Sequence, residues 1–139
     1  MCAWTDFRTI GVSVGAVLML TACESSKPSV EENVFPAAYK TSIIGAVRNV
    51  VADPTGIRDA VIAEPTLKQH GNVTRYVACF RFNAKDEGGQ YTGIKEMAGF
   101  YYNARLTQIT DADRAMCGGA SYQPFPELMR QCREINCKT

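Results

Sequence analysis

The sequence predicts an α+β domain in which one N-terminal helix packs across an antiparallel sheet. Two features of the pattern predict this class. Apolar residues recur at steps of three and four from Pro36 to Ala52, which is the period of an amphipathic helix. After the turn at 53–56 the period becomes two, which is typical of strands. Since only short turns separate these strands, we expect a meander of three or four strands with the helix on one face.

The helix is expected over Pro36–Ala52. Its apolar stripe is formed by Tyr39, Ile43, Val47 and Val50. Pro36 suits a first turn, and Asp53-Pro54-Thr55-Gly56 ends the helix in a β-turn.

The clearest strand runs from Arg75 to Asn83. Alternation places two sets of side chains on opposite faces of this strand. A strand is also expected at Ile57–Ala63, where Pro65 would confine it to an edge of the sheet. Lys68–Asn72 is expected to be a loop. The two faces of the central strand are formed by Tyr76, Ala78, Phe80 and Phe82, and by Val77, Cys79 and Arg81.

The second half of the chain is expected to continue the meander. Asp86–Gly89 turns the chain into a long strand over Tyr91–Tyr102, and Asn103-Ala104 forms a tight turn into Arg105–Thr110. Asp111 or Asp113 then caps a short helix that reaches Cys117. The remainder is expected to be irregular around Pro124 and Pro126 and helical over Glu127–Glu134. This order of elements is similar to the outline of cystatin-like folds, although no cystatin motif is present.

The N-terminal segment resembles a bacterial lipoprotein signal. Ile10–Ala22 is an apolar run of 13 positions, shorter than the roughly 20 residues of a membrane-spanning helix. It ends in Leu20-Thr21-Ala22-Cys23, which is similar to a lipobox. The resemblance implies cleavage before Cys23, acylation of that cysteine, and a membrane anchor made of lipid. An ordinary secretory signal in which Cys23 is incidental is the alternative.

The same resemblance implies a location. Glu24 follows the cysteine, where an aspartate would retain such proteins in the inner membrane. We therefore expect the periplasmic face of the outer membrane. Short stretches such as Tyr76–Asn83 and Tyr122–Leu128 are similar to those of small exported bacterial lipoproteins to which no activity is assigned.

These features divide the chain into three parts. Residues 1–22 are the expected signal peptide, residues 23–35 the acylated cysteine with a polar, flexible tether, and residues 36–139 a single domain. The net charge of the 139 residues is +1. This balance gives no reason to expect nucleic acid as a partner, and the oligomeric state stays open.

Four cysteines remain after Cys2 leaves with the signal and Cys23 takes up lipid. An even number in an oxidising compartment predicts two disulfides with three alternative pairings. We favour Cys79–Cys117 together with Cys132–Cys137, because the second pair is close in sequence at a chain end. A metal site is not expected, since no Cys-x2-Cys pair exists and His70 is the only histidine.

No residue pattern predicts catalysis or a cofactor. His70 is flanked by loop residues and lacks a nucleophile motif. Asp111 and Asp113 lack the glycine and glutamate of a calcium loop. The expected function is therefore a non-catalytic binding or scaffolding module with an envelope protein as partner. The alternative is an inhibitor of a periplasmic or incoming hydrolase, either a lysozyme or a protease.

The partner surface is expected on the part of the sheet that the helix leaves uncovered. Aromatic residues and arginine dominate the energetics of protein interfaces. The predicted surface residues are accordingly Tyr91, Tyr101, Tyr102 and Arg105.

Overall fold

The computed structural model describes residues 33–134, and side chains as far as Arg130. The expected signal peptide, Cys23 and residues 24–32 lie outside this range. So does the expected Cys132–Cys137 bridge, because neither of its side chains is described.

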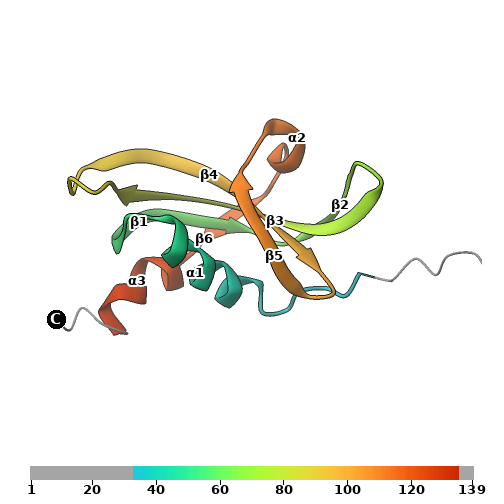
Figure 1. Cartoon of the computed structure of the whole chain (residues 1–139), viewed down its shortest axis with the longest axis horizontal. Coiled ribbons are helices and arrows are strands. Elements are labelled where there is room, and N and C mark those ends of the chain that lie inside the picture. The colour runs from blue at the N-terminus through green and yellow to red at the C-terminus, as the bar shows by residue number, and fades with distance from the viewer. Residues whose placement is uncertain (1–32, 135–139) are drawn as a thin grey trace, which may run out of the picture.

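Residues 33–134 form an α+β fold with six antiparallel strands. The elements follow in the order α1 (Tyr39–Val50), β1 (Asp53–Ala63), β2 (Thr66–His70), β3 (Val73–Lys85), β4 (Tyr91–Tyr102), β5 (Arg105–Asp111), α2 (Arg114–Cys117), β6 (Tyr122–Pro124) and α3 (Pro126–Glu134). The sheet has the order β5-β4-β3-β1-β6, with β2 pairing β3. Helices α1 and α3 lie on one side of the sheet and α2 on the other (Figure 1).

The main helix and the long hairpins confirm the sequence pattern. Helix α1 falls within the predicted range, and β4 has the predicted bounds. Asn103 and Ala104 both take positive φ, 46° and 62°, which suits the tight turn between β4 and β5. Asp113 caps α2, because its Oδ1 accepts a hydrogen bond from the Met116 N–H at 2.8 Å.

Three expectations about the sheet are wrong. It has six strands rather than three or four, and the cystatin-like outline is not confirmed. Strand β1 is not an edge strand, because β3 and β6 flank it. Of the expected loop Lys68–Asn72, only Gly71 and Asn72 form the turn, since Lys68–His70 belong to strand β2 and pair with β3. Pro65 therefore marks the break between two strands that share one partner.

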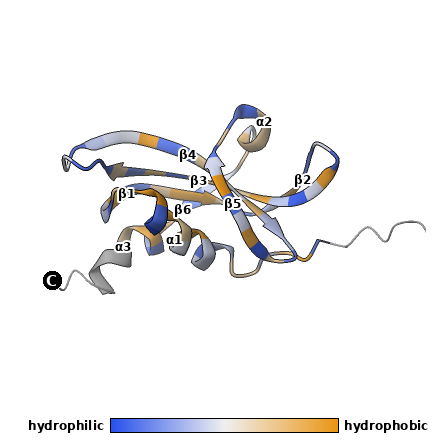
Figure 2. Ribbon diagram, viewed as in Figure 1, coloured by the Kyte–Doolittle hydropathy of each residue, from blue (hydrophilic) through white to orange (hydrophobic). Residues whose placement is uncertain are grey.

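The alternation predicted along β3 divides the core between the two faces of the sheet. On one face, Phe80 and Phe82 pack with the buried residues of α1, Phe125 and Leu128. On the other face, Val77 and Cys79 pack with Ala98, Phe100 and Cys117. Apolar and polar stretches are interspersed along the strands of the sheet (Figure 2). Segment 112–122 therefore covers a second, smaller apolar layer.

The sheet has two distinct ends. The β2–β3 turn and the β4–β5 turn lie at one end, beside the start of the described chain (Figure 1). The β3–β4 turn at 86–90 lies at the other end. Asn33 contacts the end that holds the β2–β3 turn, because its Nδ2 donates a hydrogen bond to the carbonyl oxygen of Thr74.

Candidate functional site

A disulfide fixes the segment after α2 to the middle of the sheet. Cys79 in β3 is bonded to Cys117, which is 38 residues further along the chain. This confirms the first of the two predicted pairs. Both cysteines are buried, at 2% and 5% exposure. The segment Gly118–Ala120 that follows is consequently held above the face of the sheet opposite α1.

Two hollows flank this segment. The first, which we call the β2 hollow, has a volume of about 410 Å³ and lies between β2 and residues 118–121. The second, the Arg81 hollow, measures about 450 Å³. Gly118, Gly119 and Ala120 form a wall of both. A Cβ at Gly118 would overlap the carbonyl oxygen of Arg114, so this close passage of the chain requires glycine.

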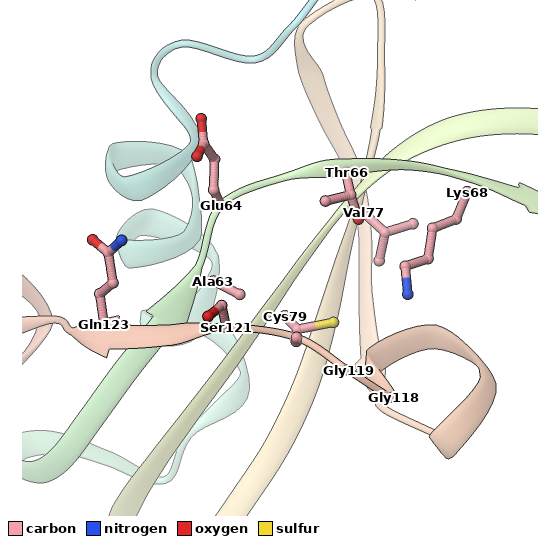
Figure 3. Close-up of a pocket in the computed structure, with 11 residues that line it drawn as sticks. Ala63, Glu64, Thr66, Lys68, Val77, Cys79, Gly118, Gly119, Ser121 and Gln123 are labelled. Atoms are coloured by element: carbon pink, nitrogen blue, oxygen red, sulfur yellow. The ribbon is translucent and has the colours of Figure 1, made fainter.

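The β2 hollow is lined by polar side chains and by backbone. Lys68 points from β2 towards the segment of Gly118 and Gly119, while Glu64 points away (Figure 3). The floor is formed by Val77 and Cys79 of β3. Among the described strands, β2 pairs with β3 alone, and β6 pairs with β1 only at Val61–Ala63. The outer edge of β2 therefore faces this hollow without a strand beside it.

A charged cluster forms one wall of the Arg81 hollow. Arg81 and Glu96 are cross-strand partners, and the guanidinium Nη2 lies 2.9 Å from Glu96 Oε1. Tyr122 donates its hydroxyl hydrogen to the same oxygen, and its ring lies 4.1 Å from the Arg81 Cζ. One carboxylate thus accepts from two side chains on the face that also holds the disulfide.

The cluster keeps fixed protonation states near neutral pH. The hydrogen bond from Tyr122, followed by that from Arg81, lowers the pKa of Glu96. Burial, followed by the bond to Glu96, raises the pKa of Tyr122 to about 12. The hydrogen bond to Glu96 raises the pKa of Arg81. Because none of the three gains or loses a proton between pH 5 and 9, the cluster is suited to holding structure or binding a ligand rather than to acid–base chemistry.

The Arg81–Glu96 pair should be visible in the acid stability of the protein. Since the folded state lowers the pKa of Glu96, its contribution is present above the usual value of 4.5 and is lost as pH falls through the folded-state value. We expect Glu96→Gln to lower the free energy of unfolding by about 1 kcal/mol at pH 7 and to reduce its fall below pH 4.5. Urea titrations between pH 3 and 7 measure both effects.

Asp111→Asn is the matched control for Glu96→Gln. Asp111 pairs with Lys95 at 3.0 Å, but the two side chains are 73% and 54% exposed. Exposed pairs contribute little, so this variant should change stability by less than about 0.5 kcal/mol. Equal effects of the two substitutions would contradict a special role for the Arg81 cluster.

The predicted partner residues do not form one surface. Tyr101 is 1% exposed, and its hydroxyl bonds the Tyr39 carbonyl and the Ser42 hydroxyl, each at 3.1 Å. It is a core residue, and its prediction as a surface residue is wrong. Tyr91 lies at the far end of β4, where Arg58 stacks on its ring at 3.3 Å. Tyr102 and Arg105 are exposed and directly opposite each other beside the β4–β5 turn.

The other candidate residues make contacts that stabilise the fold. His70 is the last residue of β2, and its ring lies 5.7 Å from that of Phe100. Asp111 forms the ion pair with Lys95 described above, and Asp113 caps the start of α2. Within residues 33–134, no three His, Cys, Asp or Glu side chains are close enough to hold a metal ion.

Sequence reasoning missed the two hollows. The signals were the pair Gly118-Gly119 directly after a half-cystine, and Arg81 on the same face of β3 as Cys79. Neither signal locates a hollow alone, because Glu96, Tyr122 and Lys68 come from three other strands.

Comparisons with known proteins do not assign this chain to a family. The chain matches no protein-family model, and neither curated proteins nor solved structures give a match. Among the helices of the described region, none has the length and apolar character needed to cross a bilayer. The structure therefore defines a disulfide-linked α+β domain with two hollows on one face of its sheet.

Proposed function

We propose that this chain is a lipid-anchored lipoprotein of the bacterial envelope whose folded domain is a non-catalytic binding module facing the periplasm. The β2 hollow is the observation that carries the binding role, because it lies beside a strand edge without a strand partner. The anchor rests on the resemblance of Leu20–Cys23 to a lipobox, and the outer membrane is the proposed location because Glu24 follows the cysteine.

The ligand of this module is an extended segment of an envelope protein. A peptide strand can add to a free sheet edge through backbone hydrogen bonds, while side-chain pockets give specificity. Here β2 supplies the edge, and residues 118–121 form the opposite wall. Among the described residues that line the hollow, Lys68 is the only cation. An acidic side chain in the bound segment would complement it.

Chemistry in the two hollows favours binding over catalysis. The thiols nearest the β2 hollow are consumed in the Cys79–Cys117 bond. In the Arg81 hollow, the pKa of Tyr122 is too high and that of Glu96 too low for proton transfer near pH 7. These observations support a surface that binds a partner without transforming it.

Photo-crosslinking in cells tests this proposal. A benzophenone amino acid is placed at Ser121, which lines the β2 hollow, or at Thr41, which is exposed on α1 on the opposite face. We expect a specific adduct from position 121 and none from position 41. Peptide mapping should place the adduct in an extended acidic segment, and Lys68→Glu should reduce its yield about tenfold or more.

The identity of the adduct decides between the two functional classes. A resident envelope protein supports the scaffold, whereas a lysozyme or protease supports the inhibitor. Equal adducts from positions 121 and 41, or an adduct insensitive to Lys68→Glu, would remove the β2 hollow as the binding site.

Replacement of Cys23 by serine tests the anchor. We expect complete loss of labelling by radioactive palmitate, together with an unprocessed or released chain, because acylation requires the cysteine thiol. Cys2→Ser is the control and should leave labelling unchanged. Normal labelling and membrane retention of the Cys23→Ser chain would refute the lipoprotein assignment.

A further inference from the structure

The tips of the two long hairpins form one patch on the face of the sheet that carries α2. Three cross-strand pairs lie there, namely Lys68 opposite Arg75, His70 opposite Val73, and Tyr102 opposite Arg105. Tyr101 pairs with Tyr76, so Tyr102, the next residue of β4, lies beside Arg75 of β3. The two hairpin tips are therefore adjacent. We call these six residues the hairpin-tip patch.

The patch carries positive charge without compensation. Lys68 and Arg75 face each other directly, an arrangement that destabilises a sheet unless an anion lies nearby. Residues 65–85 and 97–110 contain no aspartate or glutamate. The ion pairs of the described region do not involve Lys68, Arg75 or Arg105. These cations are therefore available to an external anion.

Apolar side chains surround the same end of the sheet. Seven large apolar residues are markedly exposed in the described region, and five of them lie here. Exposed apolar and aromatic residues beside cations are typical of surfaces that lie at a membrane interface. The five are Val34 (58%), Phe35 (39%), Leu67 (51%), Val73 (41%) and Tyr102 (38%).

The expected lipid anchor is close to this end. Asn33 contacts Thr74, next to the β2–β3 turn. Cys23 precedes Asn33 by ten residues in the sequence, and a chain of that length spans at most about 35 Å. This step rests on the lipid anchor of the proposed function. The tether then holds Asn33, and with it the hairpin tips, within about 35 Å of the bilayer surface.

We propose that the hairpin-tip patch docks on anionic phospholipid headgroups beside the acylated cysteine. Arg75 and Arg105 contact the phosphates, while Val73 and Tyr102 enter the interface. The opposite end of the sheet then points away from the bilayer. Ile94 marks that end, because it pairs with Asn83, ten residues along β3 from Val73, or about 33 Å.

Tryptophan quenching in reconstituted vesicles tests this orientation. Trp4 is the only tryptophan of the chain and is replaced by phenylalanine, after which Val73→Trp or Ile94→Trp introduces a single probe at either end. The full chain, purified from membranes, is reconstituted into brominated phosphatidylcholine with or without 30% phosphatidylglycerol. We expect strong quenching of the probe at position 73 in the anionic vesicles and little at position 94, which is 65% exposed.

A pair of charge variants tests the role of the headgroups. Arg75→Gln with Arg105→Gln should lower the ratio of docked to undocked protein by about 25-fold, or about fivefold per cation. Arg48→Gln with Arg130→Gln removes the same charge at two exposed sites away from the patch. This control should leave quenching unchanged. Lys68 is kept in both variants because it also lines the β2 hollow.

Other outcomes overturn the inference without affecting the proposed function. Equal quenching at positions 73 and 94, or stronger quenching at 94, would show that the patch does not face the bilayer. If the tryptophan at position 73 is not quenched by brominated lipid but its emission shifts when polyglutamate is added, the patch binds acidic protein and not the bilayer. Palmitate labelling of the same preparations tests the anchor separately, so an unlabelled chain contradicts the proposed function whatever the quenching shows.

Discussion

Replacing both Cys79 and Cys117 by serine is expected to lower the free energy of unfolding by about 4 kcal/mol. The bond closes a loop with a sequence separation of 38 residues, and the loss of chain entropy in the unfolded state scales with the logarithm of the loop length. For a domain of about 100 residues this corresponds to a fall in Tm of about 20 °C. Thermal and urea unfolding of the two proteins measures the difference.

The matched control is replacement of Cys132 and Cys137 by serine. If these two cysteines are bonded as predicted, their short loop contributes about 2 kcal/mol. The Cys79/Cys117 variant should in addition lose the adduct at Ser121, because the bond positions the wall of the β2 hollow. A double variant with near-normal stability and a retained adduct would show that packing alone holds residues 112–122 in place.

The parts of the fold that could be predicted are those set by residues that are neighbours in the sequence. Alternation along Tyr76–Phe82 and the cap at Asp113 involve neighbours in sequence, and those predictions are confirmed. The expected start of the first helix at Pro36 is not confirmed, because α1 begins at Tyr39 and its N-cap is Ala38. Strand β2 was missed because Lys68, Gln69 and His70 carry no apolar alternation. It forms because the tight turn at Gly71, with φ +61°, returns the chain along β3.

The candidate site was less predictable, because it depends on contacts between distant residues. The cysteine count predicted two disulfides, and the closeness of Cys132 and Cys137 in the sequence left Cys79 and Cys117 as the other pair, which needs no three-dimensional geometry. In contrast, Arg81, Glu96 and Tyr122 meet only once the β3–β4 register and the return of β6 are set. Tyr101 was misplaced for a related reason. Three aromatic residues in a row do not reveal which of them faces α1.

Alanine at Tyr101 and at Tyr102 should have opposite consequences, although the two residues are neighbours in β4. Tyr101 is 1% exposed and its ring lies in the core under α1, so Tyr101→Ala should cost about 4 kcal/mol of unfolding free energy. Tyr102 is 38% exposed on the other face, and Tyr102→Ala should change stability by less than about 0.5 kcal/mol. Urea denaturation of both variants makes the comparison.

Alkaline titration identifies the Tyr101 hydroxyl as part of that core. Burial raises the pKa of Tyr101 to about 12 from 10.0. The folded state therefore favours the protonated phenol, and this contribution is complete below pH 10 and is lost as pH rises to 12. Two pKa units correspond to about 2–3 kcal/mol, so the wild-type protein should lose more stability over this range than Tyr101→Phe, while Tyr102→Phe should follow the wild type. A slope shared by all three proteins would assign the alkaline loss to other groups, such as Tyr122, and would contradict the buried state of the Tyr101 hydroxyl.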